Sequence, residues 1–283
     1  MTTYRLIDFG GGQKYESLGE YRVVRPSPAA LGVRPAFRWE RPEARFDAAT
    51  RKWQFDQTWP AGCRIRFDGF HMPAIATPFG HLGFFPEQQR RWRQMIEWSP
   101  IEPGDRALNL FAYTGAATLA LAIAGYQVAH VDAAKPNVAL ARSAAESNDL
   151  GDRPIRWLVD DAQKFVDREI RRGRDYRVVV LDPPAYGHGP RGNAWRLSRD
   201  LEPLLAGVLR LMMPGGRLVV SGHDAEMDQD DLRTRLRRLG PSCRPDLDWR
   251  DASYDGDRLT LSSESGRTLD AGYSLAVTLP MPE

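Results

Sequence analysis

RALNLFAYTGAATLALAIAGYQVAHVD, residues 106–132, is the stretch from which the fold of this chain follows. It begins with the strand-like run RALNLF, turns at Gly115 and continues into AATLALAIAG, whose length and composition favour a helix. The β-type run YQVAHVD closes it. A strand, a helix and a second strand in this order form a unit whose strands lie parallel in one sheet. The stretch therefore predicts an α/β fold.

The alternation of strand and helix continues over the next hundred residues. A helical run at 136–148 is followed by three strand–helix pairs at 155–172, 176–212 and 216–240. Residues 258–279 then form two strand-like runs with no helix between them, which is typical of an antiparallel hairpin. The sequence thus predicts a Rossmann-like fold over residues 81–283, with a mostly parallel, doubly wound sheet and a terminal antiparallel hairpin.

Residues 1–80 have a different pattern. Short β-type runs such as YRVVRP and CRIRFDGF are separated by Pro, Gly and Asp clusters, which predicts a small β-rich N-terminal domain. The first hundred residues hold 15 Lys and Arg against 10 Asp and Glu, and five of the eight tryptophans. If these tryptophans and basic residues lie on a surface, they could stack on the bases and contact the phosphates of RNA. Alternatively, the tryptophans could fill the core of a small domain. Both interpretations stay open.

The composition excludes several classes of protein. A net charge of +2 excludes a histone-like binder of nucleic acid, but not an enzyme with a local basic surface. Only Cys63 and Cys243 occur, so neither a disulfide framework nor a metal site is expected, and a reducing cytoplasm is the expected location. The N-terminus lacks a signal-peptide pattern. Polar residues and glycines interrupt the apolar stretch 107–131, so no membrane span is expected.

Acidic residues follow three of the predicted strands, where doubly wound sheets bind their ligands. Asp132 could accept hydrogen bonds from two ribose hydroxyls and Asp161 from an adenine amino group, while Asp182 ends the fourth strand. The turn at Gly115 has one glycine, unlike the Gly-x-Gly-x-x-Gly loop of dinucleotide sites. An adenosyl ligand without phosphates fits, and S-adenosylmethionine is such a ligand. Each acid taken alone is more often a turn or helix cap.

These residues belong to motifs that resemble a known family. The runs LNLFAYTGAATLALAIAG, VDAAKPNVALARSAAESN, WLVDDAQKFV, VVVLDPPAYGHGP and MPGGRLVVSG are similar to those of class I S-adenosylmethionine-dependent methyltransferases. The branch they resemble most contains the 23S ribosomal RNA methyltransferases with an LNxFxYTG motif. The resemblance implies that the cofactor is bordered by Asn109, Phe111, Tyr113, Thr114 and Gly115 at its methionine part, Asp132 at the ribose, Asp161 at the adenine and Asp182 near the sulfonium.

The segment HLGFFPEQQRRW resembles the TGxFxDQRxxR segment that precedes the catalytic domain in this family. Gly83, Phe85 and Gln88 keep its pattern, which implies a cofactor contact for Gln88. Pro86 and Glu87 depart from the usual leucine and aspartate. A simple connector between two domains is the alternative.

The run DPPAY after the fourth strand predicts the place of the methyl acceptor. Pro183 and Pro184 stiffen the backbone around Asp182, which gives their carbonyl groups fixed directions. In-line transfer needs a positioned nucleophile, so these three residues are candidate catalytic residues. In amino-group methyltransferases with an (Asp/Asn)-Pro-Pro-(Tyr/Phe) motif the aromatic residue stacks on the target ring. Here Ala185 moves the candidate Tyr186 by one place, and a flexible GHGP loop is expected to follow.

A cysteine is missing where related enzymes carry one. Cytosine-5 RNA methyltransferases attack the base with a cysteine, which in the related branch follows the fifth strand in a run like Ser-Cys-Ser. This chain has Ser221, Gly222 and His223 in that region. Transfer to nitrogen or oxygen is therefore expected, with His223 as a candidate proton acceptor. The alternative is that His223 merely caps the following segment.

The sequence thus predicts an S-adenosylmethionine-dependent methyltransferase that modifies a base in ribosomal RNA without a catalytic cysteine. The N-terminal domain would serve as a docking surface for the RNA. Two alternatives stay open: a methyltransferase for a small molecule or a protein side chain, and an inactive adenosyl-binding module that supports assembly.

Overall fold

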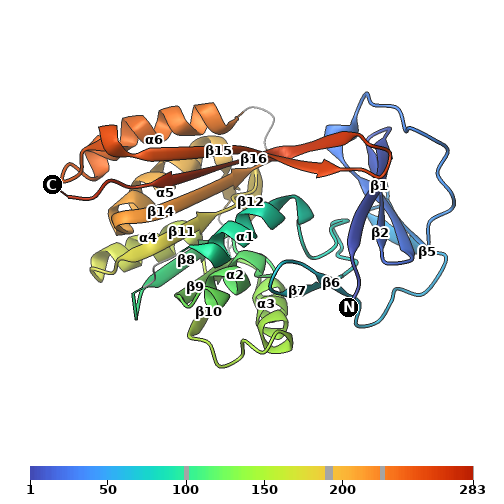
Figure 1. The fold of residues 1–283 in the computed structure, drawn as a ribbon, viewed down its shortest axis with the longest axis horizontal. Helices are drawn as coiled ribbons and strands as arrows, with labels where there is room; N and C mark the ends of the chain where they lie inside the picture. The colour runs from blue at the N-terminus through green and yellow to red at the C-terminus, as the bar shows by residue number, and fades with distance from the viewer. Residues whose placement is uncertain (99–101, 189–193, 224–226, 283) are drawn as a thin grey trace. The chain divides into compact units, whose positions relative to one another are not determined.

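The computed structural model describes residues 1–98, 102–188, 194–223 and 227–282. The chain forms two compact units (Figure 1). The N-terminal unit consists of residues 1–93 and 259–271, and the C-terminal unit of residues 94–258 and 272–283. The predicted terminal hairpin is thus shared: its end, residues 259–271, groups with the N-terminal unit.

The C-terminal unit is built on a seven-stranded sheet, which confirms the predicted Rossmann-like fold. The strand order is β10-β9-β8-β11-β14-β16-β15, and the strands from β10 to β14 pair in parallel, whereas β16 runs antiparallel to β14. The direction of winding changes between β8 and β11, where doubly wound sheets bind ligands. The bounds are β8 Arg106–Leu110, β9 Gln127–Asp132, β10 Ile155–Val159, β11 Tyr176–Leu181, β14 Met212–Gly222, β15 Ser253–Ser262 and β16 Thr268–Thr278.

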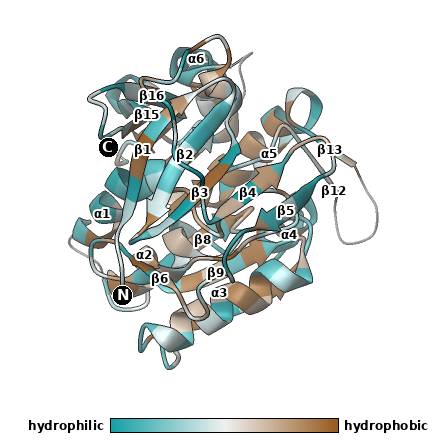
Figure 2. Cartoon of the chain, turned by 90° about the vertical axis from the view of Figure 1, so that its right-hand side faces the viewer, coloured by the Kyte–Doolittle hydropathy of each residue, from teal (hydrophilic) through white to brown (hydrophobic). Residues whose placement is uncertain are grey.

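Helices cover both faces of this sheet. Because side chains alternate along a strand, Leu108 and Leu110 of β8 face the core that α4, α5 and α6 share, whereas Asn109 faces α2. In Figure 2 the hydrophobic (brown) residues concentrate in the central strands. No helix in the described ranges is long and apolar enough to cross a bilayer. The bounds are α1 Gln89–Glu97, α2 Ala116–Ile123, α3 Lys135–Ser147, α4 Ala162–Arg171, α5 Leu197–Leu211, α6 Gln229–Cys243 and η3 Trp249–Asp251.

The segment after β11 is more regular than the sequence suggested. Tyr186–His188 form the short strand β12, which pairs antiparallel with β13, Ala194–Arg196. The predicted GHGP loop therefore begins within a strand. Its residues 189 and 190 lie outside the described residues.

The N-terminal unit is the expected β-rich region. Its five-stranded sheet has the order β1-β2-β3-β4-β5, with one parallel pair, β3 and β4. A small hairpin of β6 and β7 accompanies it. The bounds are β1 Tyr4–Gly10, β2 Gln13–Leu18, β3 Tyr21–Pro26, β4 Ala44–Asp47, β5 Lys52–Phe55, β6 Arg64–Arg66, β7 His71–Pro73, η1 Pro28–Ala30 and η2 Pro86–Gln88.

The tryptophans of this unit are partly or fully buried. The indole of Trp53 donates to the carbonyl of Thr77 at 2.7 Å, and that of Trp59 to the carbonyl of Ala74 at 3.0 Å. Trp92 is buried among Phe67 and other aromatic rings. These contacts support the interpretation in which tryptophans fill the core of a small domain.

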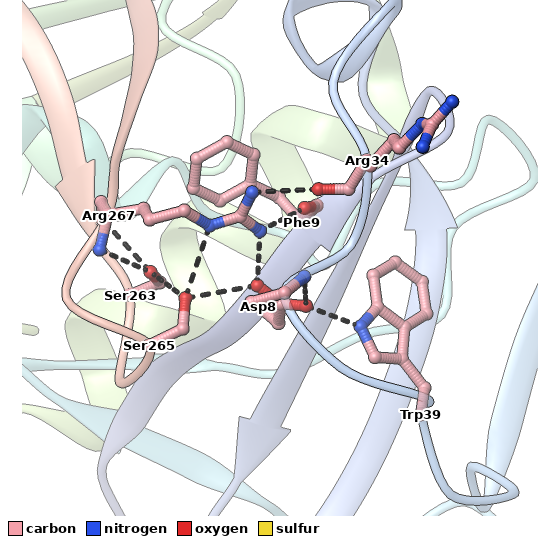
Figure 3. A network of polar contacts seen from close by, with 8 residues as sticks. Asp8, Phe9, Arg34, Trp39, Ser263, Ser265 and Arg267 are labelled. Atoms are coloured by element: carbon pink, nitrogen blue, oxygen red, sulfur yellow. Dashed lines mark hydrogen bonds and ion pairs between the residues drawn. The ribbon is translucent and has the colours of Figure 1, made fainter.

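A buried aspartate fastens the hairpin end to the N-terminal sheet (Figure 3). Asp8 of β1 accepts hydrogen bonds from Trp39 at 2.7 Å, from Ser265 at 3.0 Å and from Arg267 at 2.5 Å. Burial acts to raise the pKa of Asp8, but the hydrogen bonds outweigh it and hold the pKa below its usual value. The guanidinium of Arg267 also lies 4.4 Å from the ring centre of Phe9. The hairpin end is therefore an integral part of the N-terminal unit.

Candidate functional site

The loop that connects β8 to α2 has an unusual backbone. Phe111 and Tyr113 have φ angles of +53° and +49°, a region that side chains disfavour. Each such residue costs on the order of 1 kcal/mol, and such strain clusters at ligand-binding sites. Gly115, with φ of +93°, ends the loop, and a Cβ added to it would lie 2.9 Å from Cβ of Ala141 in α3. Position 115 therefore requires glycine, and the loop is held tightly at the switch point.

Asp132 holds this loop from the end of β9. One carboxylate oxygen accepts the backbone N–H of Tyr113 at 2.8 Å. The other accepts the N–H of Ala134 at 2.9 Å and the side-chain amide of Asn137 at 3.1 Å. Burial raises the pKa of Asp132 above its ordinary value despite these hydrogen bonds. Burying a charged carboxylate at a strand end lowers the stability of the fold. This indicates that Asp132 serves ligand binding rather than stability.

The side chain of Asn109 belongs to a buried hydrogen-bond network beneath the loop. Its side-chain amide donates to the hydroxyl of Thr118 at 2.9 Å, and that oxygen lies 2.9 Å from Nδ1 of His130. The Thr118 hydroxyl can accept a second hydrogen bond or donate its own proton, so the tautomer of His130 decides which of the two groups is the donor. Burial lowers the pKa of His130 to about 3, in agreement with a neutral ring. This buried network supports β8, α2 and β9 at the cofactor end, and the sequence analysis missed its histidine.

The acids that follow β10 cap a helix. Asp161 is the N-cap of α4 and accepts the backbone N–H of Lys164 at 3.0 Å. Its neighbour Asp160 pairs with Arg168 at 2.5 Å. One carboxylate oxygen of Asp161 is thus engaged as a cap, the alternative considered for each strand-end acid. The adenine contact of Asp161 stays a prediction.

Residues 182–184 after β11, called the DPP ledge below, are held by a residue that the sequence analysis missed. The indole N–H of Trp195 in β13 donates to the carbonyl of Pro184 at 2.7 Å. Its ring lies 4.8 Å from that of Phe111 in the β8 loop. Pro183 is buried, whereas Tyr186 is exposed. The three-residue strand β13 is too short to give a periodic signal, so only the fold reveals that Trp195 contacts both Pro184 and the cofactor loop.

Asp182 and His223 come together from neighbouring strands. Asp182 follows β11, His223 follows β14, and Nε2 of His223 lies 3.9 Å from Oδ1 of Asp182. Both side chains are partly exposed, 26% for Asp182 and 39% for His223. The fold thus places a carboxylate and an imidazole side by side at the carboxyl ends of two parallel strands.

The remaining candidate, Gln88, lies in the N-terminal unit. It ends the short helix η2 and is buried. The other candidate residues all belong to the C-terminal unit, where they lie in the last residues of strands β8 and β9, in the segments after β8, β10, β11 and β14, or in β12: Asn109, Phe111, Tyr113, Thr114, Gly115, Asp132, Asp161, Asp182, Pro183, Pro184, Tyr186 and His223.

Comparisons with known proteins agree with this geometry. Residues 82–245 match the family model described as S-adenosylmethionine-dependent methyltransferase. The solved structure of the SAM-dependent methyltransferase from Agrobacterium tumefaciens is 30% identical, with a TM-score of 0.86 over 97% of this chain and 90% of that one.

Curated relatives match a shorter part of the chain. The ribosomal RNA large subunit methyltransferase K/L of Shewanella sp. (strain MR-4) is 28% identical over 45% of this chain, and that of Methylococcus capsulatus is 34% identical over 44%. The match covers 18% and 17% of these two relatives, so this chain spans less than a fifth of their length. They are named for an action on ribosomal RNA.

Proposed function

Because the chain belongs to the family of S-adenosylmethionine-dependent methyltransferases, we propose that it transfers a methyl group to a base of RNA. The observation that carries the proposal is the pairing of Asp182 with His223 beside the DPP ledge, at the strand ends next to the cofactor loop. The names of the relatives, which refer to ribosomal RNA, support the choice of substrate.

The cofactor half of the site fits S-adenosylmethionine, which supplies a methyl group activated on a sulfonium. The strained loop from Phe111 to Gly115 presents its backbone at the switch point, where a ligand can stabilise it. Asp132 would bind the ribose, since the oxygen that accepts the N–H of Tyr113 has accepting capacity beyond that one bond. Asp161, Thr114 and Gln88 are proposed as further contacts to the cofactor.

The second half of the site, around Asp182 and His223, is where we propose that the methyl acceptor binds. Its residues fit a transfer that forms no covalent adduct between a cysteine and the acceptor. Cys63 lies in the N-terminal unit, and Cys243 ends α6. Burial raises the pKa of both thiols, so little thiolate is present near neutral pH. The catalytic groups that we propose are therefore Asp182, the carbonyls of Pro183 and Pro184, the ring of Tyr186 and the imidazole of His223.

The N-terminal unit offers a surface for RNA on its edge strand β5. Phe55 of β5 is 49% exposed, and the nearby Phe79 is 66% exposed with the guanidinium of Arg51 5.9 Å from its ring centre. Lys52, also on β5, is exposed. Exposed rings beside cations suit unstacked bases and phosphates. An RNA substrate also agrees with a cytoplasmic location.

Methyl-labelled cofactor tests this proposal. The full chain is incubated with S-adenosylmethionine labelled in its methyl group and with ribosomal RNA transcribed in vitro, which carries no modifications. We expect label in the RNA that ribonuclease releases as nucleotides. The matched control is the Asp182→Ala variant, which should incorporate label only at background. Absence of label in RNA with the wild-type chain would contradict the proposal.

The alternatives predict different results in a cell extract. Label that resists ribonuclease and follows the protein or small-molecule fraction would identify a protein side chain or a metabolite as the acceptor. Binding of S-adenosylhomocysteine without label in any fraction would identify an inactive adenosyl-binding module.

A further inference from the structure

A small cavity lies at the amino ends of β8, β9 and β10, the end of the sheet opposite the cofactor loop. Its volume is about 230 Å³. Three arginines line it: Arg106 begins β8, Arg153 lies just before β10, and Arg156 belongs to β10. The other described residues that line it include no aspartate or glutamate: Gln127, Val128, Ala129, Pro154, Ile155 and Tyr176. The strongly charged side chains of the lining are thus all positive.

The cavity is separate from the proposed cofactor site. Strand β9 begins at Gln127, which lines the cavity, and ends at Asp132, which holds the cofactor loop. A strand rises about 3.3 Å per residue, so these two residues lie roughly 16 Å apart. A ligand of the cavity would therefore be a different molecule or group from S-adenosylmethionine.

The register of the sheet brings the arginines of β8 and β10 to one face. Ala129 of β9 pairs with Arg156 of β10 on one side and with Leu108 of β8 on the other. Because side chains alternate along a strand, Arg106 lies on the same face as Leu108, the face that α4 covers. Between the two arginines, Ala129 contributes only a methyl group, which leaves room for a ligand.

A buried glutamate beside the cavity is already paired. Glu169 of α4 accepts the hydroxyl of Tyr176 at 2.7 Å and Nη1 of Arg172 at 3.0 Å. Nη1 of Arg156 lies 3.8 Å from Oε2 of Glu169, which is too far for a hydrogen bond. Within the described ranges the guanidinium of Arg156 donates no hydrogen bond, so its donors are available to a ligand.

Arg106 and Arg153 also keep donors for a ligand. Nε of Arg106 donates to the carbonyl of Asp175 at 2.9 Å, and Nη2 pairs with the carboxylate of the same residue. A guanidinium has five N–H donors, so those on Nη1 of Arg106 remain. Arg153 is exposed and forms no ion pair with any residue that the structure describes. The lining thus holds more N–H donors than the neighbouring acids use.

The size and charge of the cavity indicate a phosphate group. Guanidinium groups match phosphate oxygens in geometry and charge. Sites for a whole small molecule usually measure about 300–1,000 Å³, so this smaller cavity suits a single group of a larger ligand. The basic surface also continues past the cavity, because Arg171 and Arg172 follow at the end of α4 and Arg174 precedes β11. A chain of phosphates fits such a surface better than one isolated anion does.

We propose that the cavity binds a backbone phosphate of RNA, with Arg153 and Arg156 as its main contacts. The phosphate chemistry rests on the arginines of the lining, whereas the assignment to RNA rests on the proposed function. A contact of this kind reads no base and fixes the position of the RNA on the protein. Its loss should therefore weaken RNA binding and leave the cofactor site intact.

The first test uses inorganic phosphate and needs no RNA. At constant ionic strength, binding to the full chain broadens the phosphorus NMR line of phosphate. The double variant Arg153→Gln, Arg156→Gln should reduce this broadening about fivefold. The matched control is Arg142→Gln, Arg250→Gln, which removes the same charge from two exposed arginines that do not line the cavity. Equal broadening by the two double variants would overturn the proposal.

The second test measures the affinity for unmodified ribosomal RNA over a series of salt concentrations, without cofactor. The Arg153→Gln, Arg156→Gln variant should bind about tenfold more weakly than the wild type, because it lacks a charge-assisted phosphate contact. The slope of log affinity against log salt concentration should become shallower by about 0.7–0.9, the effect of one lost phosphate contact. The control variant should keep the affinity and the slope of the wild type. Both variants should keep the affinity for S-adenosylhomocysteine, which reports an intact fold.

The two tests separate the possible sources of the phosphate. If the first test distinguishes the variants but the RNA affinities are equal, the cavity takes a free phosphate compound and the proposal is overturned. Neither test needs turnover. If the wild-type chain binds RNA but does not methylate it, the proposed function fails, while the difference in RNA affinity between the two double variants still decides the role of the cavity.

Discussion

The two halves of the catalytic sheet, on either side of its switch point, hold their functional groups in different ways. At the ends of β8 and β9, Asp132 is 9% exposed and accepts three hydrogen bonds, and the loop it holds carries two strained residues. At the ends of β11 and β14, Asp182 and His223 are partly exposed, and Nε2 of His223 lies 3.9 Å from Oδ1 of Asp182.

This difference separates a rigid half from an adjustable one. Buried groups that are held by hydrogen bonds are already in place for a ligand, so binding costs little conformational entropy. The partly exposed pair of Asp182 and His223 lies in the half that we propose for the methyl acceptor. The family shares one cofactor, and the rigid half fits that shared task. In the other half this chain carries Gly222 and His223 where related enzymes carry the cysteine run.

The largest effect should come from removing the central acid of the rigid half. Asp132→Ala should weaken binding of S-adenosylhomocysteine about 100-fold or more, measured by calorimetry, because two hydrogen bonds to a charged group contribute about 1.5–3 kcal/mol each. Asp160→Ala is the matched control, since Asp160 also follows a strand of this sheet but pairs with Arg168. Its affinity should stay within threefold of the wild type. Equal affinities of the Asp132→Ala variant and the wild type would remove Asp132 from the site.

Much of this arrangement could be predicted from the sequence because it is local. The alternation of strands and helices and the acids after the strands are encoded within short stretches, and the structure has them there. The bracing contacts are different, because they join residues that are distant in the chain. Arg267 reaches Asp8 across 259 positions, and Trp195 meets Phe111 only once the sheet has formed. The positive φ angles of Phe111 and Tyr113 likewise lie in a loop that Asp132 holds through the N–H of Tyr113, a contact between residues 19 positions apart.

A second effect, on stability, distinguishes the histidines of the two halves. The folded-state pKa of His130 is lowered to about 3, whereas an unfolded histidine titrates near 6.5. Between these values the unfolded chain binds a proton that the folded chain does not, so stability is full above about pH 6.5 and is lost as the pH falls toward 3. From pH 7 to pH 5 the loss due to His130 should be about 2 kcal/mol.

Urea unfolding at the two pH values measures this loss. In His130→Gln, which keeps an acceptor for Thr118, the difference in unfolding free energy between pH 7 and pH 5 should shrink by about 2 kcal/mol relative to the wild type. His223→Asn is the control from the adjustable half, because His223 is partly exposed. Its difference should match that of the wild type. If the two variants behave alike, burial does not hold His130 neutral.

The smallest effect should come from Trp195, which contacts Pro184 in one half and Phe111 in the other. Trp195→Phe keeps a ring against Phe111 but removes the N–H that holds the carbonyl of Pro184. One hydrogen bond of about 1 kcal/mol corresponds to a rate change of about fivefold if the ledge is fixed in the transition state. We therefore expect kcat to fall about fivefold while the affinity for S-adenosylhomocysteine stays unchanged.

A matched variant tests whether the effect belongs to the ledge. The indole of Trp249 also donates to a carbonyl, that of Arg244, at the end of α6. Trp249→Phe should therefore leave kcat unchanged, although it removes the same kind of hydrogen bond. A fall in cofactor affinity in Trp195→Phe as large as the fall in kcat would show that the ledge belongs to the cofactor half. The boundary between the rigid and the adjustable half would then lie between β11 and β14 rather than between β8 and β11.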